Sequence, residues 1–266
     1  MNLGIIGYGN IGELISQNII NHDFYNLNKL YIANRTLSKI NHLKDTDPHI
    51  SVTDDNTEVA RNCEKIIISV KTSDLINVLE QIKPHLNKDT QIIHTCAGID
   101  LKFEDNGLSC VIPTISSTYD KNNPKKGVSI IMHDENVSAE NKDFVEDLFS
   151  KFSHVKVVDN TLDLEIATIA ASCMPAFIAL SLDIFANKLE ERCNLSKEET
   201  FKILAETLNS TTYILNEDIY SPDELINKVA TKNGITQKGL DVLDEDLPAI
   251  YKRLICNLLW LCQGLW

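Results

Sequence analysis

The sequence predicts an α/β domain with a doubly wound, mostly parallel sheet, followed by an all-helical domain. Three observations carry this prediction. A short apolar run at the amino terminus leads into three closely spaced glycines and then into a helical pattern. Strand-type and helix-type patterns alternate through the first half of the chain, and strand-type patterns then cease. We therefore expect one domain over residues 1–160 and a second over residues 161–266.

The amino-terminal glycines form a GxGxxG pattern between a predicted strand and a predicted helix. Gly7 permits a tight turn, Gly9 lets the backbone approach a pyrophosphate, and Gly12 lets helix and strand pack closely. The phosphates are expected at the start of the helix, beside Asn10 and Ile11, where free N–H groups and the helix dipole favour negative charge. The pattern predicts a Rossmann dinucleotide site.

The second predicted strand, residues 29–33, ends at Asn34, Arg35 and Thr36. Enzymes that prefer NAD usually carry an acid here, which binds the ribose hydroxyls. An amide, a guanidinium and a hydroxyl instead suit a 2′-phosphate, because Arg binds phosphate with a planar fork. The sequence predicts NADP rather than NAD.

Further patterns complete the first domain. Strands are predicted at residues 50–53, 65–71, 91–98, 109–113, 128–132 and 155–158. Helices are predicted up to about residue 63, at 75–82 and at 141–152. Ligands of open parallel sheets bind beyond the carboxyl ends of the strands. Val70, Lys71 and Gly98 therefore belong to the predicted cofactor site.

The second half carries long helical patterns at residues 163–194, 196–216 and 236–266, and a short helix starts at Ser221. Ser196 and Glu199 form a predicted capping box. The last stretch is apolar almost all round, which favours burial at a subunit interface, although a core helix of the same chain would show the same pattern. The loop at 229–236 combines glycine with hydroxyl side chains.

Composition restricts the class of protein. The chain has 266 residues, 43% of them hydrophobic and 24% charged, as in an ordinary soluble protein, and its net charge of −13 argues against nucleic acid. We expect no membrane span and no signal peptide, since the first strand begins at residue 3. Seven cysteines without a CxxC pair indicate reduced thiols, and scattered histidines indicate no metal site. The expected location is the cytoplasm.

Together these motifs resemble the pyrroline-5-carboxylate reductase family over essentially the whole chain. The segments that carry the resemblance are Gly7–Gly12 (GxGNMG in the family), Asn34–Thr36, Asp55–Asn56, Val70–Lys71 (VKP), Ala97–Gly98 (AAGI), 171–177 (SGSGPAY) and 229–239 (VTSPGGTTxxG). The resemblance implies that Asn56 contacts the adenosine and that Ala97 and Gly98 lie beside the cofactor. It also implies a helical dimerisation domain.

The implied reaction is hydride transfer from NADPH to the cyclic imine of 1-pyrroline-5-carboxylate, giving L-proline in proline biosynthesis. The enzyme would be an NADP-dependent oxidoreductase acting on a CH–NH bond. The family's loop threonine matches Thr236, whose hydroxyl is our candidate for the contact with the imine nitrogen. Backbone N–H groups around Asn233, Gly234 and Ile235 would bind the substrate carboxylate. Family members bind substrate between helices at a dimer interface, which implies a homodimer or larger homo-oligomer.

The sequence departs from the family at several positions. Met174 stands where the family has a glycine and borders the substrate pocket, and residues 112–116 lack an Asn and a Pro. In these features the chain looks closest to the divergent ComER-like branch encoded beside late-competence genes. The alternative function is therefore an NADP-binding accessory or regulatory protein with a closed or altered pocket. A dehydrogenase of another small acid is disfavoured, because residues 163–177 contain no lysine.

Three other residue groups favour structural interpretations. Cys173 has no histidine near it in the sequence and is interpreted as a small apolar residue. His94 lies in a predicted buried strand and is interpreted as a core histidine with satisfied hydrogen bonds. Asp54 and Asp55 are interpreted as the start of a helix rather than as an acid–base pair.

Overall fold

The computed structural model describes residues 1–22, 27–99, 101, 107–114 and 127–262. The chain divides into two compact units: the first is Met1–Ser172 together with Leu259–Trp266, and the second is Cys173–Leu258. Residues 115–116 of the altered segment and residues 263–266 of the last predicted helix lie outside the described residues.

One eight-stranded sheet organises the first unit, in the order β3-β2-β1-β4-β5-β6-β7-β8. Its strands are β1 (Asn2–Ile6), β2 (Lys29–Ala33), β3 (Ile50–Thr53), β4 (Lys65–Ile68), β5 (Gln91–His94), β6 (Leu108–Pro113), β7 (Val128–His133) and β8 (His154–Val157). Neighbouring strands are parallel except β6 and β7. The order from β3 to β6 is that of a doubly wound sheet, and it reverses between β1 and β4. The predicted fold class is confirmed.

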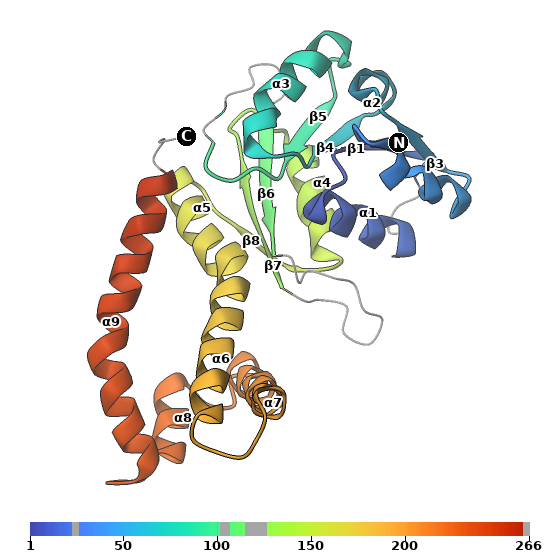
Figure 1. The fold of residues 1–266 in the computed structure, drawn as a ribbon. Helices are drawn as coiled ribbons and strands as arrows, with labels where there is room; N and C mark the ends of the chain where they lie inside the picture. Colours follow the sequence, from blue (N-terminus) through green and yellow to red (C-terminus); the bar gives the residue numbers. More distant parts are fainter. Residues whose placement is uncertain (23–26, 100, 102–106, 115–126, 263–266) are drawn as a thin grey trace. The chain divides into compact units, whose positions relative to one another are not determined.

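Helices cover both faces of the sheet (Figure 1). α1 (Asn10–His22) and α4 (Ala139–Ser150) pack on one face, where Ile5 and Ile67 point. α2 (Asn56–Asn62) and α3 (Thr72–Ile82) cover the other, where Ile66 and Ile68 point. Successive strand residues face opposite sides, so a strand buried on both faces is apolar throughout.

Two strands are shorter than predicted. β4 ends at Ile68 and β5 at His94, whereas the apolar patterns extend to residues 71 and 98. β1 turns away at Gly7, and Ile6, Ile68 and His94 are the last residues in register. The segments beyond these ends are free to line a ligand site.

Short 3₁₀ turns connect several elements: η1 (Leu37–Lys39), η2 (Asn41–Asp45) and η3 (Lys83–His85). α5 (Thr161–Thr168) starts at the predicted domain boundary, and its Leu164 is buried with Ile112 and Ile130 of the sheet. This packing groups α5 with the first unit.

The second unit is helical, as predicted. It contains α6 (Met174–Glu190), α7 (Lys197–Asn216), α8 (Pro222–Val229) and α9 (Ile235–Cys262). The predicted capping box of Ser196 and Glu199 is present at the start of α7. The single helix predicted over 163–194 is interrupted by a π-helical turn, η4 (Ile169–Cys173). Pro175 explains the turn, because proline lacks the N–H for a normal helical bond and its ring crowds the preceding turn.

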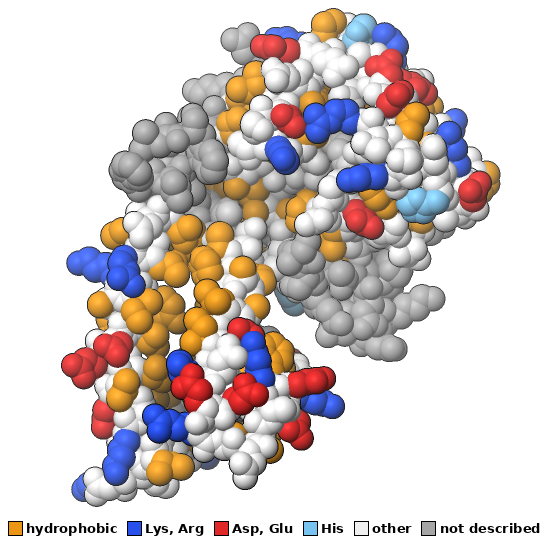
Figure 2. All heavy atoms as spheres, viewed as in Figure 1, with side chains coloured by type: hydrophobic (Ala, Val, Ile, Leu, Met, Phe, Trp, Pro, Cys, Tyr) orange, Lys and Arg blue, Asp and Glu red, His pale blue; other side chains and the backbone are white. Residues whose placement is uncertain are grey.

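The helical unit has almost no core within one chain. Among residues 173–258, all of which the structure describes, only Ala186 and Thr200 are buried. Leu180 is 60% exposed and Ile184 51% exposed, and Figure 2 shows hydrophobic side chains gathered over α6. Such an apolar surface indicates a partner that covers it.

The stretch Thr161–Glu190 is long and apolar enough to cross a membrane by length and composition alone, and 6% of its most apolar window is buried within the chain. A helix that packs against another protein subunit has the same composition.

Candidate functional site

The three glycines of the amino-terminal turn differ in why the position needs a residue without a side chain. Gly7 adopts φ 101°, and a Cβ there would collide with the Ser69 carbonyl oxygen. A Cβ on Gly12 would collide with the Gly7 carbonyl oxygen. Around Gly9 a Cβ would meet nothing within 4 Å. Two glycines therefore shape the turn, and the third leaves open space above the backbone for a ligand.

The start of α1 offers unpaired backbone donors. The first N–H bonded along the helix is that of Glu13, which donates to Gly9 O at 2.8 Å. The N–H groups of Asn10, Ile11 and Gly12 precede it, as at every helix start. They lie at the carboxyl end of β1, so this edge of the sheet suits a phosphate group.

The end of β2 carries no carboxylate, since Asn34, Arg35 and Thr36 follow Ala33. Arg35 and Thr36 are exposed, and Arg35 forms no ion pair with any described residue. Asn34 is half-buried, and its side chain accepts from Tyr8 N–H at 3.2 Å and donates to Thr36 O at 2.9 Å. Arg35 is therefore available for a ligand, whereas Asn34 already binds backbone on both sides.

The ends of β4 and β5 complete this edge. Val70 is half-buried after β4, and the exposed Lys71 is the N-cap residue of α3. After β5, Ala97 is half-buried and Gly98 is exposed with φ 71° and open space at its Cβ position.

Sequence reasoning missed a hydroxyl pair at the same edge, in which Thr95 Oγ1 donates to Ser69 Oγ at 3.1 Å. Each hydroxyl directly follows a strand end, which was the signal available in the sequence.

Asn56 takes part in helix packing. Its side-chain N–H donates to Gln81 Oε1 of α3 at 2.9 Å, and Asn56 is half-buried. The N-cap of α2 is Asp55, whose Oδ1 accepts from Thr57 N–H at 2.8 Å. The hydrogen bonds from Thr57 lower the pKa of Asp55, which fits the interpretation of this carboxylate as a helix start.

The loop before α9 has the geometry of an anion site. Asn233 has φ 62°, and Gly234 N–H donates to Thr231 O at 2.8 Å. The first N–H bonded along α9 is that of Lys238, which donates to Gly234 O at 3.3 Å. The N–H groups of Ile235 and Thr236 precede it, and the Thr236 side chain lies in the same turn. Anion donors and a hydroxyl thus occur together.

Met174 is not brought to this loop within one chain. Met174 is the first residue of α6, directly after η4. The helix α9 begins after α8, at the other end of the helical unit (Figure 1). Met174 is 38% exposed. The predicted substrate residues therefore form two separate groups in a single chain.

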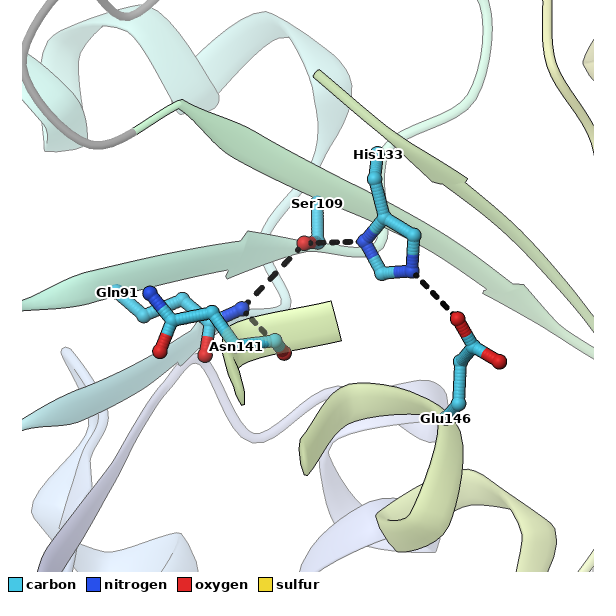
Figure 3. Close-up of polar contacts among 5 residues, drawn as sticks. All are labelled: Gln91, Ser109, His133, Asn141 and Glu146. Carbon is cyan, nitrogen blue, oxygen red and sulfur yellow. Dashed lines mark hydrogen bonds and ion pairs between the residues drawn. The ribbon is translucent and has the colours of Figure 1, made fainter. Parts of the chain in front are cut away.

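A second polar cluster joins β5, β6, β7 and α4 (Figure 3). Ser109 Oγ lies 2.8 Å from His133 Nδ1, and His133 Nε2 lies 3.4 Å from Glu146 Oε1. Gln91 Nε2 donates to Ser109 Oγ at 3.5 Å and to Asn141 O at 3.0 Å. The order serine, histidine, carboxylate resembles a nucleophile system. Ser109 is completely buried, so substrate has no access to its hydroxyl and the cluster is structural.

His94 is buried on β5, as predicted, but its hydrogen bonds are incomplete. Its Nδ1 has no partner within the described residues. Burial lowers the pKa of His94 to about 4. Burial also raises the pKa of the Cys96 thiol to about 11. Neither group is prepared for proton transfer or thiolate chemistry near neutral pH.

No group of side chains in the described part of the chain has the makeup of a metal site. The six cysteines that the structure describes as free are Cys63, Cys96, Cys110, Cys173, Cys193 and Cys256.

Comparisons with known proteins agree with this division. The model for "NADP oxidoreductase coenzyme F420-dependent" matches residues 2–98, and that for "Pyrroline-5-carboxylate reductase dimerisation" matches residues 162–258. A pyrroline-5-carboxylate reductase of Methanobrevibacter smithii is 82% identical over 251 residues, covering 94% of this chain and 100% of that protein. The chain belongs to the pyrroline-5-carboxylate reductase family.

Other members of the pyrroline-5-carboxylate reductase family agree. Pyrroline-5-carboxylate reductase 3 of Bacillus subtilis (strain 168) is 31% identical over 257 residues, and the aligned region covers 95% of this chain and 92% of that protein. The solved reductase of Streptococcus pyogenes has a TM-score of 0.83 at 21% identity, covering 100% of this chain and 99% of that one. The pyrroline carboxylate reductase of Plasmodium falciparum, solved with NADP bound, has a TM-score of 0.78 at 21% identity. The match covers 99% of this chain and 95% of that one.

The predicted NADP-dependent oxidoreductase and its helical dimerisation domain are confirmed by these family matches. ComE operon protein 4 of Bacillus subtilis (strain 168) is 25% identical over 97% of this chain. That identity is lower than those of the two reductases above, and the special likeness to the ComER-like branch stays a prediction.

Proposed function

We propose that this protein reduces 1-pyrroline-5-carboxylate to L-proline with NADPH, as a step of proline biosynthesis. The observation that carries the proposal is the 82% identity to a reductase of that name along its entire length. The open glycine turn, the absence of an acid after β2 and the loop before α9 fit the same reaction.

The residues at the sheet edge fit NADP. Gly9 and Gly98 leave open space, the start of α1 offers N–H donors to the pyrophosphate, and Arg35 is free to grip the 2′-phosphate. When bound, NADPH supplies the hydride that the imine carbon accepts. The remaining cofactor contacts that we propose are made by Asn10, Ile11, Gly12, Thr36, Asn56, Val70, Lys71 and Ala97.

The residues of the chain have to bind the imine and supply a hydrogen bond or a proton to its nitrogen. Reduction places electron density on the imine nitrogen, which needs a hydrogen bond or a proton as the hydride arrives. The Thr236 hydroxyl is the group that we assign to that nitrogen. The N–H groups of Ile235 and Thr236, at the start of a helix, hold the carboxylate, and the left-handed backbone of Asn233 shapes the loop.

We infer that the active form is a homodimer or larger homo-oligomer built through the helical units. Three observations support it: the missing core of residues 173–258, the exposed faces of α6, and the match to a dimerisation domain. Because Met174 and Thr236 lie at different ends of one helical unit, we assign them to one substrate pocket only across two chains. The net charge and the free thiols fit a cytoplasmic enzyme without nucleic-acid or membrane partners.

Met174 motivates the alternative that the protein binds NADPH without reducing an imine. Its side chain replaces the hydrogen of the family glycine, and in a closed pocket it would fill space that the imine needs. On this alternative the protein serves an accessory or regulatory role.

The deciding experiment measures NADPH oxidation on addition of 1-pyrroline-5-carboxylate, beside NADPH binding by fluorescence. We expect turnover, and a fall of at least about a hundredfold in kcat for Thr236→Val with NADPH affinity retained. Thr211→Val is a matched control, because its hydroxyl donates to Thr207 O within α7 at 2.8 Å. NADPH binding with no turnover at millimolar imine would reject the reductase and favour the alternative.

A further inference from the structure

Asn34 links two parts of the nucleotide site that are distant in sequence. Its Oδ1 accepts from the N–H of Tyr8, inside the glycine turn, at 3.2 Å. Its Nδ2 donates to the carbonyl oxygen of Thr36, in the turn that carries Arg35, at 2.9 Å. One amide therefore holds the pyrophosphate turn and the 2′-phosphate turn at a fixed separation.

The surroundings make this link rigid. Asn34 N–H donates to Thr53 O of β3 at 3.0 Å, and Gly7 N–H donates to Ala33 O of β2 at 2.8 Å. The Tyr8 side chain is buried in the core, and its hydroxyl accepts from Gln17 Nε2 at 3.0 Å. The Thr36 carbonyl oxygen also accepts from Lys39 N–H at 3.1 Å, so both backbone groups that Asn34 binds are anchored from another side.

An amide meets both requirements, because it carries an acceptor oxygen and a donor nitrogen. A carboxylate at this position would still accept from Tyr8 N–H, but it would face the Thr36 carbonyl oxygen without a proton to donate. A hydroxyl carries its donor and its acceptor on one atom, whereas the amide has them on two. The same amide also keeps negative charge away from a 2′-phosphate, where an acid would repel it.

We infer that Asn34 is a positioning residue for cofactor selectivity: its side chain sets the geometry of the glycine turn and of the Arg35 turn together. This inference rests on the proposed function for its choice of cofactor. It assigns Asn34 an action through Tyr8 and Thr36, and it places the direct contact with the 2′-phosphate on Arg35. The link should therefore affect NADPH more than NADH, since only NADPH uses both turns.

The test measures dissociation constants of NADPH and NADH by fluorescence for wild type, Asn34→Ala, Arg35→Ala and the double variant. Losing two hydrogen bonds should weaken NADPH about tenfold or more in Asn34→Ala, and NADH about threefold through the glycine turn alone. In the Arg35→Ala background the NADPH penalty of Asn34→Ala should shrink to about that seen with NADH, because the second turn no longer contributes.

Two further variants isolate the link. Asn34→Asp should weaken NADPH more than Asn34→Ala and should favour NADH, since it keeps the Tyr8 bond and adds charge. Asn62→Ala is the matched control, because the Asn62 side-chain amide donates to the nearby Glu58 O at 2.7 Å and to no other described residue; it should bind both cofactors as wild type does. With imine present, Asn34→Ala should raise KM for NADPH and leave kcat at saturating NADPH unchanged, whereas general loss of structure would lower kcat and Tm.

Equal penalties for NADPH and NADH, or penalties of Asn34→Ala and Arg35→Ala that simply add for NADPH, would overturn the inference. Unchanged binding in Asn34→Ala would do so as well. Binding is measured without imine, so wild type that binds NADPH and fails to reduce the imine rejects the proposed function and leaves this inference standing.

Discussion

His94 should make the protein sensitive to acid, and replacing it should remove part of that sensitivity. The imidazole is 4% exposed on β5, and its Nδ1 has no hydrogen-bond partner within the described residues. Burial disfavours the charged form and lowers the pKa to about 4, from 6.5 in the unfolded chain, although a hydrogen bond with the Cys96 backbone opposes this effect. The folded state thus takes up its proton at lower pH than the unfolded state.

The sign and size of the effect follow from proton linkage. Above pH 6.5 both states are neutral at this residue, and His94 adds no pH dependence. As the pH falls below 6.5 the unfolded state is protonated first, so the free energy of unfolding decreases until the pH reaches about 4. At about 1.4 kcal/mol per pH unit the total loss is roughly 3 kcal/mol, and at pH 5 it is roughly 2 kcal/mol.

The assay is urea unfolding at pH 7.5 and pH 5.0, at one protein concentration, for wild type and His94→Asn. The variant should lose about 2 kcal/mol less than wild type between the two values. His42→Asn, the same substitution at an exposed site of η2, is the control. An identical loss in wild type and His94→Asn would refute the reasoning about the buried neutral imidazole. His133, whose pKa burial also lowers, contributes in the same direction and should be measured separately.

Two further predictions test the nucleotide turn and the helical unit. Gly9→Ala should fold with an unchanged Tm and bind NADPH at least about tenfold more weakly, since its Cβ meets open space; Gly7→Ala should lower Tm, because its Cβ would collide with the Ser69 carbonyl. A lower Tm in both variants would show that a side chain at residue 9 also disturbs the packing of the folded chain. Ile184→Asp should convert the oligomer to a monomer in light scattering, since Ile184 is 51% exposed within one chain. The control is Lys202→Asp, a charge change at an exposed site of α7. If Ile184→Asp remains an oligomer, α6 is not part of the interface.

Local patterns predicted much of the fold. The glycine turn with its flanking strand and helix, the capping box of Ser196 and the alternation of strands and helices each depend on residues close in sequence. The physical causes are short-range: left-handed backbone at Gly7, a side chain that caps its own helix, and apolar spacing along one strand. Strand ends were predicted less well, because β4 and β5 stop where β1 turns away, which is a property of the partner strand.

By itself the sequence determined the kind of cofactor and the family, because the glycine spacing, the missing acid after β2 and the loop with Thr236 are contiguous motifs. The tertiary structure decided what those residues touch. Asn34 was predicted as a ligand of the cofactor, and the folded chain adds that its amide joins Tyr8 to Thr36 across the ends of two strands. Ser109, His133 and Glu146 form a cluster that no local pattern announces, because strand pairing and helix packing bring them together. Met174 and Thr236 look like parts of one pocket in the sequence, yet the length and direction of α6 and α9 place them at different ends of the helical unit. Hydrogen bonds and packing between distant segments depend on the folded chain, and residue spacing alone does not encode them.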